Sequence, residues 1–111
     1  MNNAIEKELL ETGVLVLRLN RPEVLNAMNR DLIVGLLDII NETIDDEKVR
    51  SIVLTGNGRG FCAGADLVDG GWPNEDNLSA GQSAGKNMET AFNPLVKAIT
   101  QSGKPIVTAI N

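Results

Sequence analysis

The chain has 111 residues, of which 42% are hydrophobic and 23% are charged, and its formal net charge is −5. This length fits one small domain or part of a larger one, with the composition of a soluble globular protein. The acidic balance argues against nucleic acid or an anionic membrane as a partner. The single cysteine, Cys62, and the lack of histidine exclude an internal disulfide and a Cys/His metal site.

The ends and the apolar runs of the chain bear on its location. The N-terminus lacks the charged-then-apolar pattern of a secretory signal. No apolar run approaches the roughly 20 residues of a membrane-spanning helix. The sequence therefore predicts a cytoplasmic protein with no membrane partner and no bound metal.

The first half of the chain predicts a hairpin followed by a helix. Residues 4–10 and 14–19 have the composition of strands, and Gly13 lies in the turn between them. Asn29 is placed to cap a helix over 30–44, in which apolar residues recur at helical spacing. The acidic residues that follow are unfavourable at a helix C-terminus, so the helix is expected to end there.

The second half predicts two further strands and a second helix. Residues 49–55 are short and nearly continuously apolar, which predicts a strand buried on both faces. Residues 68–85 predict a mobile loop that becomes partly helical. Pro94 is expected to kink a helix over 88–101 or to mark a junction in it. With a last strand over 105–110, the order predicts an α/β fold.

Small residues crowd the segment that follows the third strand, between Cys62 and Asp66. Such residues let backbone N–H groups approach a ligand without side chains in the way. Preorganised N–H donors aimed at an oxygen are the usual oxyanion hole of acyl chemistry. Tight packing at a strand-to-helix turn would explain the same residue types, so this pattern alone leaves both interpretations open.

Three segments in the same order resemble the crotonase family, also called the enoyl-CoA hydratase/isomerase superfamily. They are residues 19–29, 59–67 and 104–111. The resemblance implies a spiral of ββα units, of which residues 1–111 would be the incomplete N-terminal portion of a single domain. It also implies an enzyme for acyl-CoA thioesters, with CoA as part of the substrate and no covalently bound cofactor. The full-length protein would be a homotrimer or hexamer.

The resemblance also assigns roles to residues of two segments. The Ala63 N–H would be one of two donors to the thioester oxygen. The residues along the CoA would be Val24, Leu25, Ala63, Gly64, Ala65, Asp66 and Leu67. Glu23 stands where some relatives carry a lysine, so Arg21 and Arg59 are the candidates for charge near the nucleotide.

Few groups in the chain could transfer protons. Cys62 has no histidine partner, which favours apolar packing over nucleophilic attack. The carboxylates in question are Asp66, Asp69, Glu75, Asp76 and Glu89. A solvated acidic loop accounts for all but Asp66, for which the family suggests a structural or cofactor-side role. Trp72 is open to two interpretations, a loop anchor or part of a lid over the acyl group.

Two classes of function follow. The first is an acyl-CoA enzyme whose second oxyanion donor and catalytic carboxylates would lie past Asn111, so that the chain alone is expected to be inactive. Enoyl-CoA hydration is favoured, and a ring-epoxide or double-bond isomerase of the phenylacetyl-CoA type is the alternative, based on the long loop after Asp66 and on residues 91–96. The second class is a non-catalytic crotonase-like scaffold.

Overall fold

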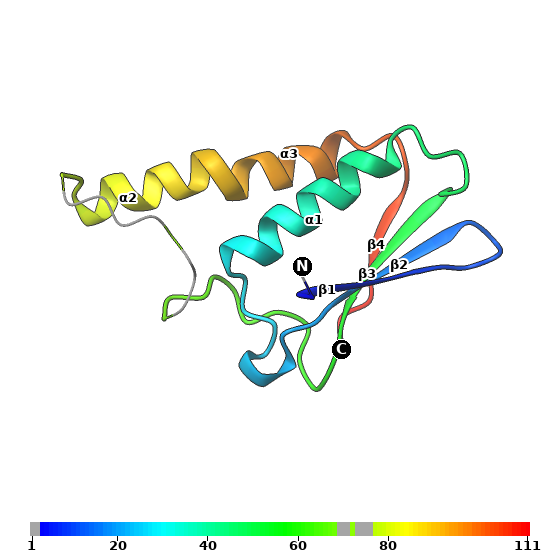
Figure 1. Ribbon diagram of the computed structural model, residues 1–111, viewed down its shortest axis with the longest axis horizontal. Helices are drawn as coiled ribbons and strands as arrows, with labels where there is room; N and C mark the ends of the chain where they lie inside the picture. The colour runs from blue at the N-terminus through cyan, green and yellow to red at the C-terminus, as the bar shows by residue number, and fades with distance from the viewer. Residues whose placement is uncertain (1–2, 69–71, 73–76) are drawn as a thin grey trace.

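The computed structural model describes residues 3–68, 72 and 77–111 of the chain (Figure 1). Its strands are β1 (Ile5–Leu9), β2 (Val14–Leu19), β3 (Ser51–Gly56) and β4 (Ile106–Thr108). Its helices are α1 (Arg30–Thr43), α2 (Ala80–Asn87) and α3 (Asn93–Gln101), with a 3-10 turn at Pro22–Val24 and a π-helical turn at Met88–Phe92.

The four strands form one sheet in the order β1-β2-β3-β4. The β1 and β2 strands pair antiparallel as the predicted hairpin, whereas β2 with β3 and β3 with β4 pair in parallel. Parallel neighbours need a crossover connection. Here α1 makes the first crossover and the α2–α3 segment makes the second, with α1 and α3 side by side over the sheet (Figure 1). The predicted α/β class is confirmed.

The core lies between one face of the sheet and the helices. Along β2, Leu15, Leu17 and Leu19 are buried and alternate with half-buried neighbours. The β3 strand alternates in the same way, with Ile52 and Leu54 buried. The expectation that β3 is buried on both faces is therefore wrong, because the helices of the described residues cover a single face of the sheet.

The α1 helix begins and ends as the sequence predicted. The Asn29 side chain accepts a hydrogen bond from the Leu32 N–H at 2.9 Å, which satisfies one of the free donors of the first turn. At the other end, the Lys104 ammonium donates to the Thr43 carbonyl and, at 2.6 Å, to the Asp46 carbonyl. A positive side chain suits a helix C-terminus, where the unpaired carbonyls carry partial negative charge.

The predicted junction at Pro94 is confirmed. The α3 helix begins at Asn93, with Pro94 in its first turn and the π-helical turn directly before it. Proline has no N–H to donate and its ring crowds the carbonyl four residues earlier. A locally widened turn accommodates both effects. The predicted late helix of the loop segment is also present as α2, whereas residues 69–71 and 73–76 lie outside the described residues.

The two capped helices differ in what they bury, and this difference predicts unequal effects of cap removal. Asn29→Ala should lower the free energy of unfolding by about 1 kcal/mol, because α1 packs in the core. Ser79 caps α2 in the same way through Gln82, yet α2 has no buried residue. Ser79→Ala should therefore leave the urea unfolding midpoint nearly unchanged. Equal shifts for the two variants would contradict this account of α1.

Candidate functional site

The segments that leave β2 and β3 pair with each other again after both strands have ended. Met28 and Ala65 form an isolated parallel bridge. The Met28 N–H donates to the Gly64 carbonyl at 2.7 Å, and the Asp66 N–H donates to the Met28 carbonyl at 2.9 Å. Both loops thus start from the same edge of the sheet and are tied to each other by backbone hydrogen bonds.

This bridge fixes the direction of the Ala65 peptide group. In an extended segment the backbone groups of successive residues point to opposite sides. Since Gly64 and Asp66 bond to Met28, the Ala65 N–H points away from Met28. Ala65 is exposed, and no acceptor for its N–H is found among the described residues. The Ala65 N–H is therefore a backbone donor of this loop without an acceptor among the described residues.

The Ala63 N–H has a different environment. It donates to the Leu25 carbonyl at 3.0 Å, so it is already occupied by the segment that follows β2. Gly64, between the two alanines, has a φ of +103°, in the region that favours glycine. This residue changes the direction of the chain between Ala63 and Ala65. The bond to Leu25 argues against Ala63 as the oxyanion donor, the role that the sequence had suggested, and leaves Ala65 as the better candidate.

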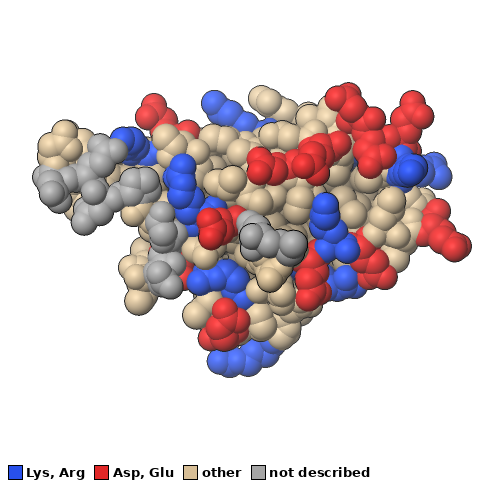
Figure 2. All heavy atoms as spheres, viewed as in Figure 1, with Lys and Arg blue, Asp and Glu red and all other residues tan. Residues whose placement is uncertain are grey.

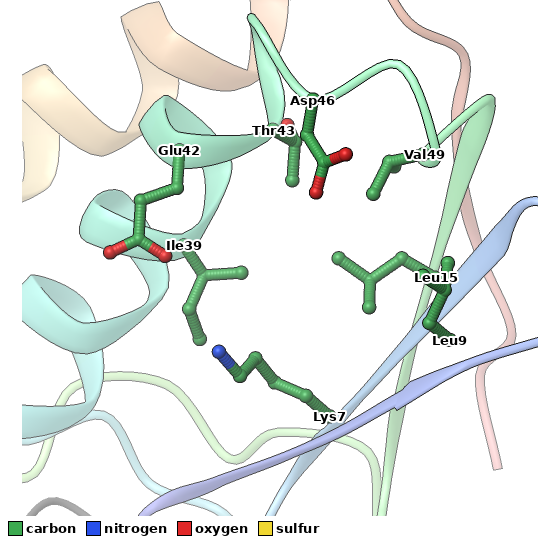
Figure 3. Close-up of a pocket in the computed structure, with 8 residues that line it drawn as sticks. All are labelled: Lys7, Leu9, Leu15, Ile39, Glu42, Thr43, Asp46 and Val49. Atoms are coloured by element: carbon green, nitrogen blue, oxygen red, sulfur yellow. The ribbon is translucent and has the colours of Figure 1, made fainter.

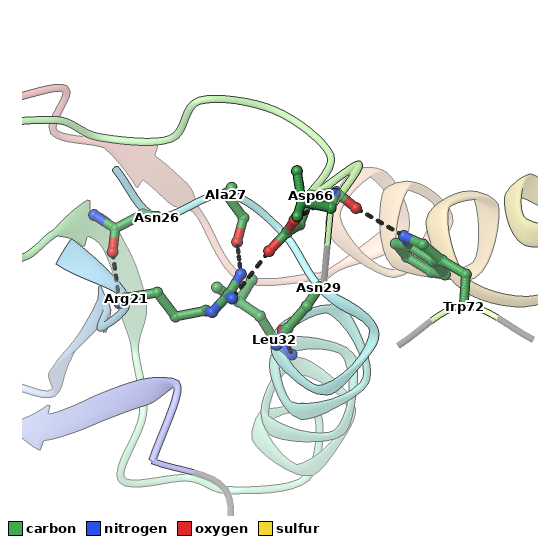
Figure 4. Close-up of polar contacts among 8 residues, drawn as sticks. Arg21, Asn26, Ala27, Asn29, Leu32, Asp66 and Trp72 are labelled. Carbon is green, nitrogen blue, oxygen red and sulfur yellow. Dashed lines mark hydrogen bonds and ion pairs between the residues drawn. The ribbon is translucent and has the colours of Figure 1, made fainter. Parts of the chain in front are cut away.

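An ion pair between Arg21 and Asp66 holds the two loops together from the inside (Figure 4). The Arg21 Nη2 and Asp66 Oδ2 atoms are 3.0 Å apart, and the two side chains are only 13% and 8% exposed. The other Arg21 nitrogen donates to the Ala27 carbonyl, and Asp66 Oδ1 accepts the Val68 N–H at 3.0 Å. Arg21 is thus turned inward, which argues against it as a phosphate ligand, whereas Arg59 is exposed.

Asn26 is a residue of this site that the sequence reasoning missed. It is fully buried with a φ of 56°, and its side-chain oxygen accepts the Arg21 N–H at 2.7 Å. Its amide group donates to the carbonyls of Asn57 and Gly60 at 3.0 and 2.9 Å. The sequence did contain a signal for Asn26, because it follows a turn that begins with a proline. Asn tolerates the positive φ that such a position can require.

An apolar cavity of about 250 Å³ opens beside the loop. Its lining includes Met28, Leu36, Phe61, Cys62, Phe92 and Leu95. Cys62 is half-buried in this wall and its sulfur lies 3.5 Å from the Gly64 N–H. This position fits the apolar packing role predicted for it. Met28, the bridge partner of Ala65, belongs to this lining, so the Ala65 donor is next to a residue of the apolar wall.

Trp72 connects this loop to the π-helical turn. Its ring stacks on Phe92 with a centroid distance of 5.2 Å and an interplanar angle of 29°. Its Nε1–H donates to the Asp66 carbonyl at 3.1 Å (Figure 4). Of the two interpretations of Trp72, these contacts support the loop anchor.

Residues 10–111 match the sequence profile of the family described as Enoyl-CoA hydratase/isomerase. The chain belongs to the enoyl-CoA hydratase/isomerase family. It is 39% identical over 102 residues to the 1,2-epoxyphenylacetyl-CoA isomerase of Escherichia coli K12, covering 92% of this chain and 38% of that protein. It is 35% identical over 113 residues to a Rhodobacter capsulatus protein described as "Probable enoyl-CoA hydratase", with coverages of 98% and 38%.

Solved structures of the family share this fold. An enoyl-CoA hydratase/isomerase from Pseudoalteromonas atlantica superposes with a TM-score of 0.74 at 34% identity, covering 97% of this chain and 39% of that one. The crotonase-like fold predicted from the sequence is confirmed. The chain spans 38% of the length of the two curated relatives above.

Within the enoyl-CoA hydratase/isomerase fold, the residues predicted to contact CoA lie on two touching turns. Leu25 and Ala63 are joined by their hydrogen bond, and Val24 and Leu67 are 39% and 92% exposed. Asp66 is the exception, because it is buried and paired with Arg21. Its side chain therefore serves the loop, whereas the exposed members of the set are accessible to a ligand.

Of the carboxylates considered as bases, the structure describes Asp66 and Glu89. Glu89 is exposed on the π-helical turn, and Asp69, Glu75 and Asp76 lie outside the described residues. In the described ranges, 3–68, 72 and 77–111, no cluster of His, Cys, Asp or Glu could hold a metal ion. Within the same ranges, no helix has the length and apolar character needed to cross a membrane.

A second pocket, of about 320 Å³, lies between β1 and the end of α1 (Figure 3). Lys7, Glu42 and Asp46 give it a mixed charge, and Leu9 and Ile39 contribute apolar surface. None of the residues predicted for the family site lines it. The pocket therefore adds nothing to the family site at the exits of β2 and β3.

The close approach around Asn26 predicts a strong effect at Gly56. A Cβ atom there would lie 2.8 Å from both Asn26 Nδ2 and the Phe61 carbonyl oxygen. Gly56→Ala should destabilise the protein by about 1–3 kcal/mol through overpacking, measured by urea unfolding. Gly81→Ala is the matched control, because nothing lies within 4 Å of its Cβ position, and it should be neutral or slightly stabilising. A tolerated Gly56→Ala would contradict the packing described here.

Proposed function

We propose that this chain supplies the thioester-binding half of an enzyme that stabilises an acyl-CoA enolate, with the Ala65 N–H as one donor of the oxyanion hole. The observation that carries the proposal is the free and fixed N–H of Ala65 beside the apolar cavity. Family membership supports the class of substrate.

The chemistry requires a donor of this kind. Adding water across a double bond conjugated to a thioester, or removing a proton next to the thioester, builds negative charge on the carbonyl oxygen. A donor that is already in position stabilises that charge without reorganisation during the reaction. The Ala65 N–H is held through Gly64 and Asp66, its neighbours in the chain, so it meets this requirement.

The surroundings of Ala65 can receive the remaining parts of an acyl-CoA. The cavity lined by Phe61 and Phe92 offers apolar surface to the acyl group. The exposed side chains of Val24 and Leu67 flank the same loop and would lie along the CoA. Arg59 is our candidate for a phosphate contact. CoA enters as part of the substrate, so no separate bound cofactor is proposed.

Proton transfer requires a carboxylate other than Asp66. The Asp66 carboxylate is buried and bonded to both Arg21 and the Val68 N–H, which makes it a poor acceptor for a substrate proton. We therefore assign the acid and base to groups past Asn111, and infer that residues 1–111 alone do not turn over. The cytoplasmic location and the homotrimeric or hexameric full-length protein remain predictions.

A second candidate is isomerisation of a ring-type acyl-CoA. The 39% identity to a 1,2-epoxyphenylacetyl-CoA isomerase favours it, and so do the two phenylalanines in the cavity wall. Aromatic rings pack well against each other, so such a wall suits a ring in the substrate. A non-catalytic scaffold would keep the cavity and the donor without either reaction.

The function is tested with the full-length gene product and two substrates. Crotonyl-CoA should lose its enoyl absorbance if the protein is a hydratase, and 1,2-epoxyphenylacetyl-CoA should be converted if it is the isomerase. The same assays on residues 1–111 should show no turnover. Turnover by residues 1–111 would contradict the assignment of the acid and base, and inactivity of the full-length product on a panel of acyl-CoA esters would favour the scaffold.

The choice of Ala65 over Ala63 is tested by replacing single backbone amides with esters in semisynthetic full-length protein. The ester at Ala65 removes the free N–H and should lower kcat/KM by about 100–1,000-fold. The ester at Ala63 removes a donor that bonds Leu25, so it should cost about 0.5–1.5 kcal/mol of stability with little effect on kcat/KM. The reverse pattern would restore Ala63 as the donor.

A further inference from the structure

The geometry points to Arg21 and Asp66 as a positioning pair that sets the direction of the Ala65 N–H, an inference that rests on the proposed function. Neither residue would touch the substrate. Both act through the backbone of the loop. The pair thus forms part of the site without being catalytic in the strict sense.

Asp66 is the best-anchored residue of the loop. Its N–H donates to the Met28 carbonyl at 2.9 Å, and its own carbonyl accepts the Trp72 Nε1–H at 3.1 Å. Its two carboxylate oxygens accept from Arg21 and from the Val68 N–H, each at 3.0 Å. The Ala65 N–H belongs to the peptide group between Gly64 and Ala65, whose Gly64 carbonyl accepts the Met28 N–H at 2.7 Å. The anchored Asp66 holds the next peptide group, so the chain on both sides of the Ala65 Cα is fixed.

Arg21 holds Asp66 from the other loop and is itself fixed. Its backbone N–H bonds the Asn26 side chain at 2.7 Å, and its guanidinium also donates to the Ala27 carbonyl. The planar guanidinium bridges two acceptors at once, which a lysine ammonium reproduces poorly. At 13% and 8% exposure, the pair is also shielded from solvent, so the loss of one partner would leave an uncompensated charge.

The Arg21–Asp66 pair differs from the charged groups on the surface of the protein. Acidic and basic side chains are intermixed on the face seen in Figure 2. The Arg21–Asp66 pair differs in being nearly buried, whereas the Arg18–Glu8 pair has side-chain exposures of 32% and 53%. Exposed pairs of that kind contribute little to stability. A role in positioning explains why a charged pair is placed under the loop.

The test compares Arg21→Lys and Asp66→Asn with Lys104→Met in the full-length gene product. Lys104 also anchors a side chain to backbone carbonyls, but at the far end of α1, about 20 Å along the helix from Asn29. It therefore controls for loss of stability without a change in the loop. The readouts are kcat and KM for the acyl-CoA substrate, the melting temperature, and hydrogen–deuterium exchange of residues 22–29 and 61–68.

The positioning pair predicts a fall in kcat of about 100-fold for Asp66→Asn, and less for Arg21→Lys, with KM changed less than about threefold. The rate of hydrogen–deuterium exchange at residues 61–68 should be about tenfold or more higher in Asp66→Asn and Arg21→Lys than in Lys104→Met. Each protein is measured at the same number of degrees below its own melting temperature. The inference would be overturned if the two loop variants kept the kcat and the exchange rates of the wild type. It would also be overturned if Lys104→Met raised the exchange at residues 61–68 as much as they do. If the wild type is inactive, the proposed function fails, and the exchange comparison still decides whether the pair holds the loop.

Discussion

The chain segments that follow β2 and β3 pair again in parallel at an isolated bridge between Met28 and Ala65, and the rest of the site depends on this bridge. Two hydrogen bonds join Met28 to Gly64 and Asp66 at 2.7 and 2.9 Å. They hold together two loops that are separated by α1 and β3 in the sequence. Because parallel strands bring their carboxyl ends to one edge, the α/β fold itself places these loops together, and ligands of open α/β sheets commonly bind at such an edge.

Polar groups buried under the loops keep this pairing in register. Asn26 links both turns through three side-chain hydrogen bonds, and Arg21 bridges from the first loop to Asp66 on the second. Buried polar groups are costly unless they are bonded, so each of these residues holds its partners in place. The Ala65 N–H has no acceptor among the described residues, and it lies on an exposed residue of a well-anchored loop.

Much of the fold could be read from the sequence because it depends on local signals. Asn29 capped α1 as expected, and Pro94 fell at the junction before α3. The geometry of the site could not be read in the same way. The choice between Ala63 and Ala65 depends on the φ of Gly64, and the inward turn of Arg21 depends on a residue 45 positions away. Family motifs located the loop, but only the hydrogen bonds showed that the Ala63 N–H is bonded to Leu25 whereas the Ala65 N–H has no acceptor among the described residues.

The most direct test of the central claim is a crystal structure of the full-length gene product with a non-reactive acyl-CoA thioester analogue. The account predicts that the analogue's carbonyl oxygen lies about 2.7–3.1 Å from the Ala65 nitrogen, while the Ala63 N–H keeps its bond to Leu25. An oxygen bound to the Ala63 nitrogen, with the bond to Leu25 broken, would contradict it.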